Sequence, residues 1–358
     1  MFNNRFIIFT WLWMGLTCCC LASEQFEQQA LLFPDIQGAN RLLGANRQLH
    51  GLDGVIEADL VYSASWKRFH FLGEYLASTK EAELERLQIG WQFADDSHIW
   101  LGRFHVPSNY WTTAFHHGKF LQTSISNPGI SEFEDYGGVI PIHSTGLLLD
   151  SGLLFNDGAG IKTAVSAGTS PVLEDNFLES FNLLNPSSES DLAFHFRFSY
   201  LPDYFKDDQV GIHAVYAHIK AEDASFQGSP ISRIELINFG GFFSWRFQEW
   251  HVFSVISHVI SRLESDRFND QSSFTAGFLQ LEYELDDSWT FYGRLETSRG
   301  AGTSNYLHLI PSFTKARQLV GTRFEFLENQ ALTLELAHVE TMLARFNQGL
   351  IQWSAVFP

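Results

Sequence analysis

Histidines and carboxylates are concentrated in one segment of the sequence, between residues 98 and 143. Five of the 14 histidines lie there together with three neighbouring carboxylates, namely His98, His105, His116, His117 and His143 with Glu132, Glu134 and Asp135. Imidazole and carboxylate groups together suit zinc or copper. The adjacent residues His116 and His117 would, however, point to opposite sides of an extended segment. The segment therefore predicts either a zinc or copper site at His116 and His117 or histidines that anchor a loop through hydrogen bonds.

Residues that could catalyse hydrolysis do not form a known motif. Ser124 follows Thr123 and Ser144 follows His143, but no Gly-x-Ser-x-Gly nucleophile elbow is present. The sequence also lacks a His-Glu-x-x-His motif, a phosphate loop and a dinucleotide fingerprint. We therefore expect no enzyme activity, and no cofactor apart from the zinc or copper alternative.

Segments in which apolar and polar side chains alternate recur along the sequence. In the clearest of them one face is apolar and the other carries charges of both signs: residues 87–93, 192–200, 279–285, 289–295 and 332–336. A period of two is typical of β-strands. Strands of about 9–11 residues cross a bilayer at a tilt, whereas strands of soluble sandwiches are usually about 5–6 residues long. The pattern predicts an all-β fold, a transmembrane antiparallel β-barrel with its apolar face toward lipid.

The first 22 residues have the composition of a cleaved signal peptide. Arg5 is the only charge, residues 6–16 form an apolar core, and Cys20 and Ala22 provide small side chains for a cleavage site. All three cysteines lie in this segment, so the mature chain is predicted to have no disulfide and no thiol. These features predict export from the cytoplasm.

The end of the sequence has the pattern of a strand that closes a barrel. Ile351, Trp353, Ala355 and Phe357 point one way, and Gln352 and Ser354 point the other. An aromatic residue usually ends the closing strand of outer-membrane barrels, and here Pro358 follows it. Both ends of the chain therefore favour an outer-membrane location.

The net charge is strongly negative. The sequence has 23 Lys and Arg residues against 41 Asp and Glu residues, a formal charge of −18. A nucleic-acid-binding protein is expected to carry a basic surface, so this balance argues against nucleic acid as a partner. It is compatible with a lumen that attracts cations, and equally with general solubility.

Connection lengths predict the number of strands. Tight links at residues 63–65, 94–97, 286–288 and 327–330 alternate with long ones at Pro107–His143, Gly168–Asp191, Lys220–Pro230 and Ser298–Lys315. Bacterial barrels have an even number of strands, short periplasmic turns and longer external loops. With both termini in the periplasm, this predicts about 16 strands, with 14 as the alternative.

The start of the barrel follows from the same argument. A strand is needed before residues 55–62, and residues 46–52 provide the room for it, with Asp53-Gly54 as the turn. The predicted organisation is a signal peptide at 1–22, a periplasmic lead-in at 23–45 and a barrel at 46–358, in which residues 107–143 form a constriction loop.

The segment Pro107–His143 is predicted to fold into the barrel. It follows the predicted fifth strand, His98–Val106, and contains apolar residues throughout: Trp111, Phe115, Phe120, Ile125, Ile130, Phe133 and Tyr136. A flexible external loop would be richer in Ser, Gly and charge. The residues expected at the pore constriction are Arg103, His105, His116, His117, Glu132, Glu134, Asp135 and His143.

Charged residues on the polar faces of the strands are expected to line the lumen. The basic set is Arg86, Arg103, Arg197, Arg294 and Arg323, and the acidic set is Glu282, Glu284, Glu296, Glu325 and Glu335. Opposed rows of charge across a constriction would orient dipolar solutes and set ion selectivity. Alternatively, the two sets pair within the wall and only solvate the lumen.

The sequence resembles a family of porin-like outer-membrane proteins of Gram-negative bacteria. Around the predicted loop, the resemblance rests on Leu101-Gly102-Arg103-Phe104, Tyr110-Trp111, His116-His117-Gly118, Leu121-Gln122-Thr123-Ser124, Phe133-Glu134-Asp135 and Pro141-Ile142-His143. Near the end of the chain it includes Gln318–Phe326, Ala331–Val339 and Gln352-Trp353-Ser354. The resemblance implies a barrel with a pore and does not imply a particular solute.

These observations together predict a porin through which small hydrophilic solutes or ions diffuse, with a preference for cations. The alternatives are a structural or adhesive outer-membrane barrel and a metal-uptake channel with a His-rich loop. The expected partners are outer-membrane lipid and lipopolysaccharide, the barrel-assembly machinery and the solute itself. A homotrimer is an open alternative to a monomer.

Overall fold

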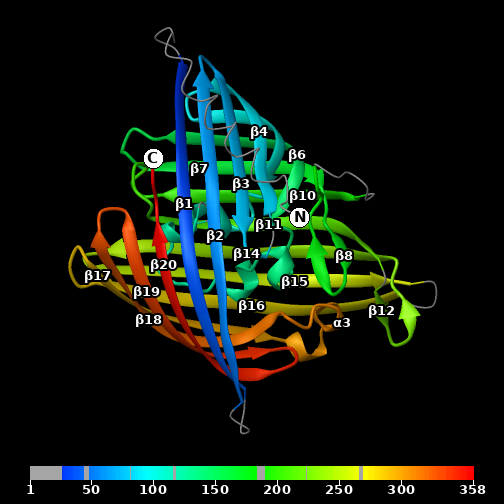
Figure 1. Cartoon of the computed structure of the whole chain (residues 1–358). Coiled ribbons are helices and arrows are strands. Elements are labelled where there is room, and N and C mark those ends of the chain that lie inside the picture. Colours follow the sequence, from blue (N-terminus) through cyan, green and yellow to red (C-terminus); the bar gives the residue numbers. More distant parts are fainter. Residues whose placement is uncertain are drawn as a thin grey trace, which may run out of the picture.

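Sixteen long strands form one closed antiparallel barrel (Figure 1). The computed structural model describes residues 26–43, 48–80, 82–115, 118–183, 190–222, 224–265 and 269–358. The barrel strands are β1 (Phe26–Leu43), β2 (Gln48–Trp66), β3 (Phe69–Ser78), β4 (Ala82–Ala94), β5 (Ser97–His105), β6 (His143–Leu154), β7 (Gly160–Thr169), β10 (Leu192–Leu201), β11 (Gln209–Ala221), β14 (Arg233–Phe247), β15 (Trp250–Glu264), β16 (Asn269–Glu284), β17 (Trp289–Arg299), β18 (Thr314–Leu327), β19 (Gln330–Thr341) and β20 (Arg345–Ala355). The predicted fold class and the count of 16 strands are confirmed.

The last strand closes the barrel against the first. Residues Asp35–Leu43 of β1 pair with Phe346–Ser354 of β20. Phe357 extends the closure, because its backbone exchanges hydrogen bonds of 2.8 and 2.9 Å with Leu32. A spanning sheet must satisfy its backbone groups internally, since lipid offers no partner for them. The predicted closing strand is therefore confirmed, and Pro358 lies beyond the last of these hydrogen bonds.

The predicted start of the barrel is wrong. Residues assigned to a periplasmic lead-in, 23–45, instead contribute strand β1, and the proposed turn at Asp53-Gly54 lies inside β2. Gly54 pairs with Gly38 in the β1–β2 ladder, so neither glycine marks a turn there. The tight link expected at residues 63–65 is also part of β2, and the turn falls at Lys67-Arg68. Residues 1–22, the predicted signal peptide, lie outside the described ranges.

The predicted inward and outward faces of the strands are confirmed. On β16, Leu279 and Leu281 are each 42% exposed, whereas Gln280 is fully buried and Glu282 is 6% exposed. The same alternation runs along β19, where Leu332, Leu334 and Leu336 face outward. An apolar outer band of this kind is what a barrel presents to lipid.

The connections at the two ends of the barrel differ in length, as predicted. One end has short turns, such as Asp95-Asp96 and Glu328-Asn329. The other end carries two small hairpins, β8 (Val172–Glu174) with β9 (Phe177–Glu179) and β12 (Ser225–Phe226) with β13 (Ser229–Pro230), and a link containing η4 (Ala301–Thr303) and α3 (Asn305–His308). Among the described elements, no helix is long and apolar enough to span a membrane.

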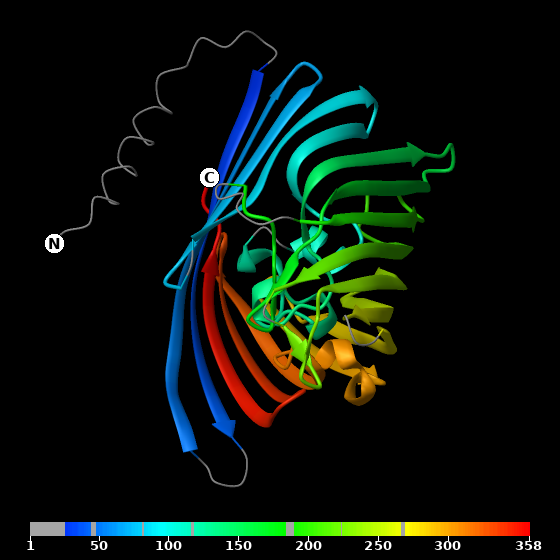
Figure 2. The ribbon, with the colours of Figure 1, turned by 90° about the vertical axis from the view of Figure 1, so that its right-hand side faces the viewer.

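The segment between β5 and β6 turns into the barrel (Figure 2). It contains α2 (Tyr110–Phe115) and three short helices, η1 (Lys119–Leu121), η2 (Gly129–Ser131) and η3 (Glu134–Tyr136). We call residues 106–142 the inner segment. Its apolar composition is explained by its packing, because Trp111 lies against Phe253 and Phe278 on the inner face of β15 and β16.

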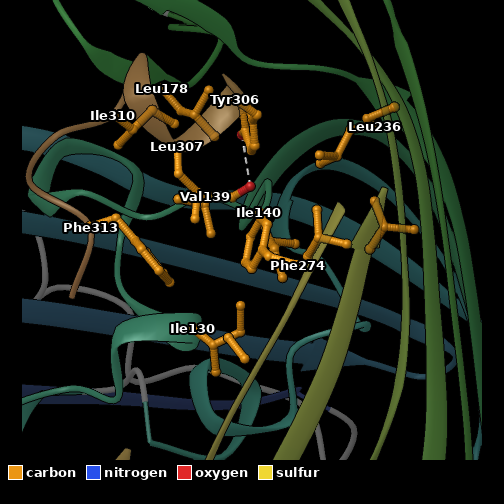
Figure 3. Packing of buried hydrophobic residues seen from close by; sticks show 14 of the residues in the cluster. Ile130, Val139, Ile140, Leu178, Leu236, Phe274, Tyr306, Leu307, Ile310 and Phe313 are labelled. Carbon is orange, nitrogen blue, oxygen red and sulfur yellow. Dashed lines mark hydrogen bonds between the residues drawn. The ribbon is translucent and has the colours of Figure 1, made fainter. Parts of the chain in front are cut away.

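A hydrophobic core joins the inner segment to other connections at the same end of the barrel (Figure 3). Val139 and Ile140 pack with Leu307 and Ile310, and the Tyr306 hydroxyl donates a 2.8 Å hydrogen bond to the Val139 carbonyl. Inward residues of β14 to β16 join this core, including Leu236 and Phe274. Parts of the inner face of β14–β16 are therefore apolar, because the inner segment supplies apolar partners there.

Candidate functional site

The inner segment is anchored to one wall of the barrel, formed by β17, β18 and β19. Carboxylates of this wall accept hydrogen bonds from backbone amides of the segment. The Ile125 amide donates to Glu335 at 3.0 Å, and the Gly129 amide donates to Glu296 at 2.7 Å. Because charged acceptors form the stronger class of hydrogen bond, these two contacts fix the path of the segment.

Arginines of the same wall bind backbone carbonyls of the inner segment. Arg294 donates to the Ser126 carbonyl at 2.8 Å, Arg317 to the Asn127 carbonyl at 2.6 Å, and Arg323 to the Gln122 carbonyl at 2.9 Å. Arg317 was not among the predicted site residues. It lies on the same inward face of β18 as Arg323, six residues away, and this even spacing was the signal that could have identified it.

The predicted basic and acidic residues have partners close by in the barrel wall. Arg294 pairs with Glu296 on its own strand at 2.8 Å, and Arg323 pairs with Glu325 at 3.0 Å. The other predicted charges also have partners nearby: Arg86 with Glu74, Arg197 with Thr113, Glu282 with His251, and Glu284 with Arg246. Charges of both signs are therefore interleaved within the wall, and Glu284 and Glu325 are exposed at strand ends.

A cavity of about 970 Å³ lies beside the inner segment and is lined by β1, β2 and β4, and also by residues of β18, β19 and β20. Its charged lining residues are predominantly acidic, with nine carboxylates: Asp35, Glu57, Asp59, Glu83, Glu85, Glu132, Glu134, Asp135 and Asp175. The cationic lysine and arginine side chains along it are Lys80, Lys119 and Arg317. Four of these carboxylates are buried, with exposures of 5% or less: Asp35, Asp59, Glu85 and Glu134. The other five face the solvent of the cavity more directly.

The acidic wall was missed by the sequence analysis. Asp35 falls in the supposed lead-in, so it was not considered as a barrel residue. Glu57 and Asp59, and likewise Glu83 and Glu85, are two positions apart and therefore share the inward face of their strands. That spacing is visible in the sequence. The segments that carry it alternate less regularly between apolar and polar residues than the clearest strands do.

Four of the predicted constriction residues meet at the base of the inner segment. His143 lies between two carboxylates, with Nε2 2.7 Å from Glu85 and Nδ1 2.6 Å from Glu134. The ring of His105 is 5.0 Å from that of His143, and Arg103 contacts Glu83 at 2.8 Å. All four predicted residues, Arg103, His105, Glu134 and His143, are at least nine-tenths buried.

The remaining predicted constriction residues lie on the cavity or outside the described part of the chain. Glu132 accepts a 3.0 Å hydrogen bond from Asn127, and burial raises the pKa of its carboxyl above the ordinary value. Asp135 also lines the cavity. His116 and His117, the predicted metal ligands, lie outside the described residues, so the zinc or copper hypothesis for them stays a prediction.

Solved structures of outer-membrane channels share this fold at low sequence identity. An anion-selective porin from Comamonas acidovorans is 10% identical with a TM-score of 0.58, over 93% of this chain and 100% of that one. The outer membrane channel DcaP of Acinetobacter baumannii is 11% identical with a TM-score of 0.57, over 94% and 99%. OmpF of Salmonella typhi is 11% identical with a TM-score of 0.57, over 92% and 97%.

No protein-family profile matches the sequence, and no curated protein is similar to it. The assignment therefore rests on the structure. The closed ladder and the apolar outer band make the chain a transmembrane β-barrel, the form that proteins of the Gram-negative outer membrane take. Its 16 antiparallel strands give it the fold of the Gram-negative outer-membrane porins.

Proposed function

We propose that the protein is an outer-membrane porin that lets small hydrophilic solutes and ions diffuse through its barrel, with a preference for cations. The observation that supports this proposal is the acidic cavity beside the inner segment, which β1, β2 and β4 help to line. The inner segment is the proposed constriction, because it occupies the lumen beside that cavity. The proposed function is passive and includes no catalytic step.

The preference for cations follows from the carboxylates that are in contact with cavity solvent. Glu57, Glu83, Glu132 and Asp135 are partly exposed, and Asp175 is exposed. A confined space lined by one sign of charge raises the local concentration of the opposite ion. The porin of Comamonas acidovorans is described as anion-selective although its fold is similar. Selectivity in this chain is therefore assigned to the side chains of the lining and not to the fold.

The test is the reversal potential of single channels in a planar bilayer under a gradient of potassium chloride. The full chain should conduct, and the sign of the potential should show that potassium is the more permeant ion. The combined variant Glu57→Gln, Asp135→Asn and Asp175→Asn should shift the potential toward the anion side. Glu284→Gln is the matched control, because Glu284 is an exposed carboxylate paired with Arg246 at a strand end.

Two results would contradict the proposal. A barrel that folds but carries no current would favour the structural or adhesive alternative. A reversal potential that does not move in the combined variant would show that these carboxylates do not set selectivity. The same recordings test the predicted pair His116-His117, because micromolar zinc or copper should reduce the current and replacement of both residues by Ala should abolish that reduction.

The proposed partners follow from the barrel surface. Outer-membrane lipid and lipopolysaccharide would contact the apolar outer band, and the barrel-assembly machinery would insert the closed sheet. We also propose a homotrimer, supported only by the fold shared with OmpT of Vibrio cholerae, which is described in a trimer form and is 9% identical with a TM-score of 0.57, over 93% of this chain and 100% of that one. The native mass of the unheated protein in detergent should equal three chains, and a mass of one chain would reject the trimer.

A further inference from the structure

Three metal-ligating side chains converge at the base of the inner segment, on three neighbouring strands. Glu85 is on β4, and His105 and His143 are directly paired in the β5–β6 ladder. Their ligand atoms all lie within 4.8 Å of one another, with His143 Nε2 2.7 Å and His105 Nε2 4.0 Å from Glu85 Oε2. We call these three residues the Glu85 cluster.

A β-bulge in β4 places Glu85 and its neighbour Arg86 on the same, inner face. Along the β3–β4 ladder, Glu74 pairs with Arg86 but Tyr75 pairs with Leu84, so Glu85 is the extra residue. A regular strand would send Glu85 and Arg86 to opposite faces, whereas both are buried here, at 5% and 9% exposure. Bulges are enriched beside functional sites because they redirect a side chain.

Glu134 orients His143 as the supporting carboxylates of metal sites do. Glu134 contacts His143 Nδ1 at 2.6 Å, and its other oxygen accepts hydrogen bonds from the amides of Ile142 and His143 at 2.7 and 3.1 Å. A ligating histidine usually donates its second nitrogen to a carboxylate, which fixes the ring and its tautomer. With Nδ1 held by Glu134, Nε2 of His143 is directed toward Glu85.

The cluster is accessible from the lumen. Glu85, Glu134 and His143 line the cavity. Two imidazoles and one carboxylate form a ligand set that suits zinc, with a fourth position left for water or solute from the cavity. Calcium and magnesium prefer sets made of oxygen alone. Tetrahedral zinc places its ligands about 3.4 Å apart, so a modest contraction of the cluster is sufficient.

We propose that Glu85, His105 and His143 bind one zinc-class divalent cation at the base of the inner segment, with Glu134 as the residue that positions His143. The bound ion links β4 to β6, where the segment returns to the wall, and offsets part of the negative charge beside the cavity. This site differs from the pair His116-His117, and its occupancy does not require the barrel to conduct.

Direct binding tests the proposal. The untagged full chain is folded in detergent, stripped with a chelator and titrated with Zn²⁺ at neutral pH, with bound zinc measured by mass spectrometry after equilibrium dialysis. One equivalent of zinc is expected. His105→Ala and Glu85→Gln should abolish this binding, and Glu134→Gln should weaken it about 10–100-fold. Co²⁺ bound in place of zinc should give the visible absorption of a tetrahedral site, which the same variants should lose.

The controls separate this site from other histidines. His195→Ala removes a histidine that is also buried in the wall but contacts Ser166 at 3.0 Å, and it should retain one equivalent. A variant with Ala at both His116 and His117 should also retain it. Heat-modifiability of each variant on a gel verifies that the barrel has folded, and His105→Asn serves if His105→Ala does not fold. Binding that is absent from the unmodified chain, or unchanged by replacement of His105, would overturn the proposal and leave His143 as an ion-pair bridge between Glu85 and Glu134.

Discussion

Two walls of the barrel carry inward charges, and the inner segment gives them different roles. On β17–β19, Arg294 and Glu335 bind backbone groups of the segment, so their charges are used as anchors. On β1, β2 and β4, Glu57 and Glu83 face a cavity that the segment leaves open. Both walls have the same period of two. The difference teaches that an inward charge reaches the solvent of the cavity only where no loop covers it.

The largest effect expected on the anchoring wall is that of Arg294→Ala. The side chain of Arg294 is fully buried, and its loss would leave Glu296 buried with fewer partners. Breaking a buried pair by removal of one partner costs about 3–5 kcal/mol. The measurement is the free energy of unfolding in urea from lipid vesicles. The control Arg246→Ala breaks a pair that is half exposed and should cost less than about 1 kcal/mol. Equal costs would mean that the wall does not depend on these anchors.

A lysine on the outer face tests the boundary between lipid and lumen. Leu334 is 47% exposed on the apolar band, one residue from the buried anchor Glu335. Leu334→Lys should cost about 2–4 kcal/mol if the site is near the bilayer midplane. The free energy of unfolding, measured from vesicles of defined lipid, gives this cost. A lysine tolerated at no cost would show that this position does not face hydrocarbon, and the inward assignment of Glu335 would then need revision.

Gly129→Val should loosen the inner segment with a smaller cost. A Cβ at Gly129 would lie 2.8 Å from Thr314 Cβ and 2.9 Å from the Thr314 carbonyl oxygen. Overpacking of this kind costs about 1–3 kcal/mol. Single-channel conductance should rise, because the segment would be displaced from its wall. Gly302→Val is the control, since no atom lies within 4 Å of the added Cβ, and it should leave conductance unchanged. An unchanged conductance in Gly129→Val would show that the inner segment does not form the constriction.

The smallest effect expected is the salt dependence of selectivity. The Debye length, over which charges act on one another in solution, falls from about 10 Å at 0.1 M salt to about 3 Å at 1 M. The cation preference of the unmodified barrel should therefore decline as the salt concentration rises. The hydrogen bonds between the anchoring wall and the inner segment are direct contacts, so they should still hold the segment in place. Reversal potentials measured across this range give the result. A preference independent of salt would point to size or direct coordination instead of the acidic wall.

The sequence by itself determined the faces of the strands, the end that carries the long connections and the inward path of residues 107–143. These features depend on local composition and on a period of two, and both can be read without knowing which strands are neighbours. The position of β1 was not determined in this way. Its strand character comes from pairing with β2 and β20, which lie at the two ends of the chain.

Only the tertiary structure decided which charges act as anchors, which face the cavity and which meet at Glu85. Arg294 and Glu57 both point inward from their strands. Their roles differ because Arg294 contacts residues of the inner segment that are 168 and 170 positions away in sequence. The Glu85 cluster depends on a bulge and on pairing between His105 and His143, 38 positions apart. Alternation specifies the face of a side chain, whereas its partner is set by the register of strands and the docking of a distant loop.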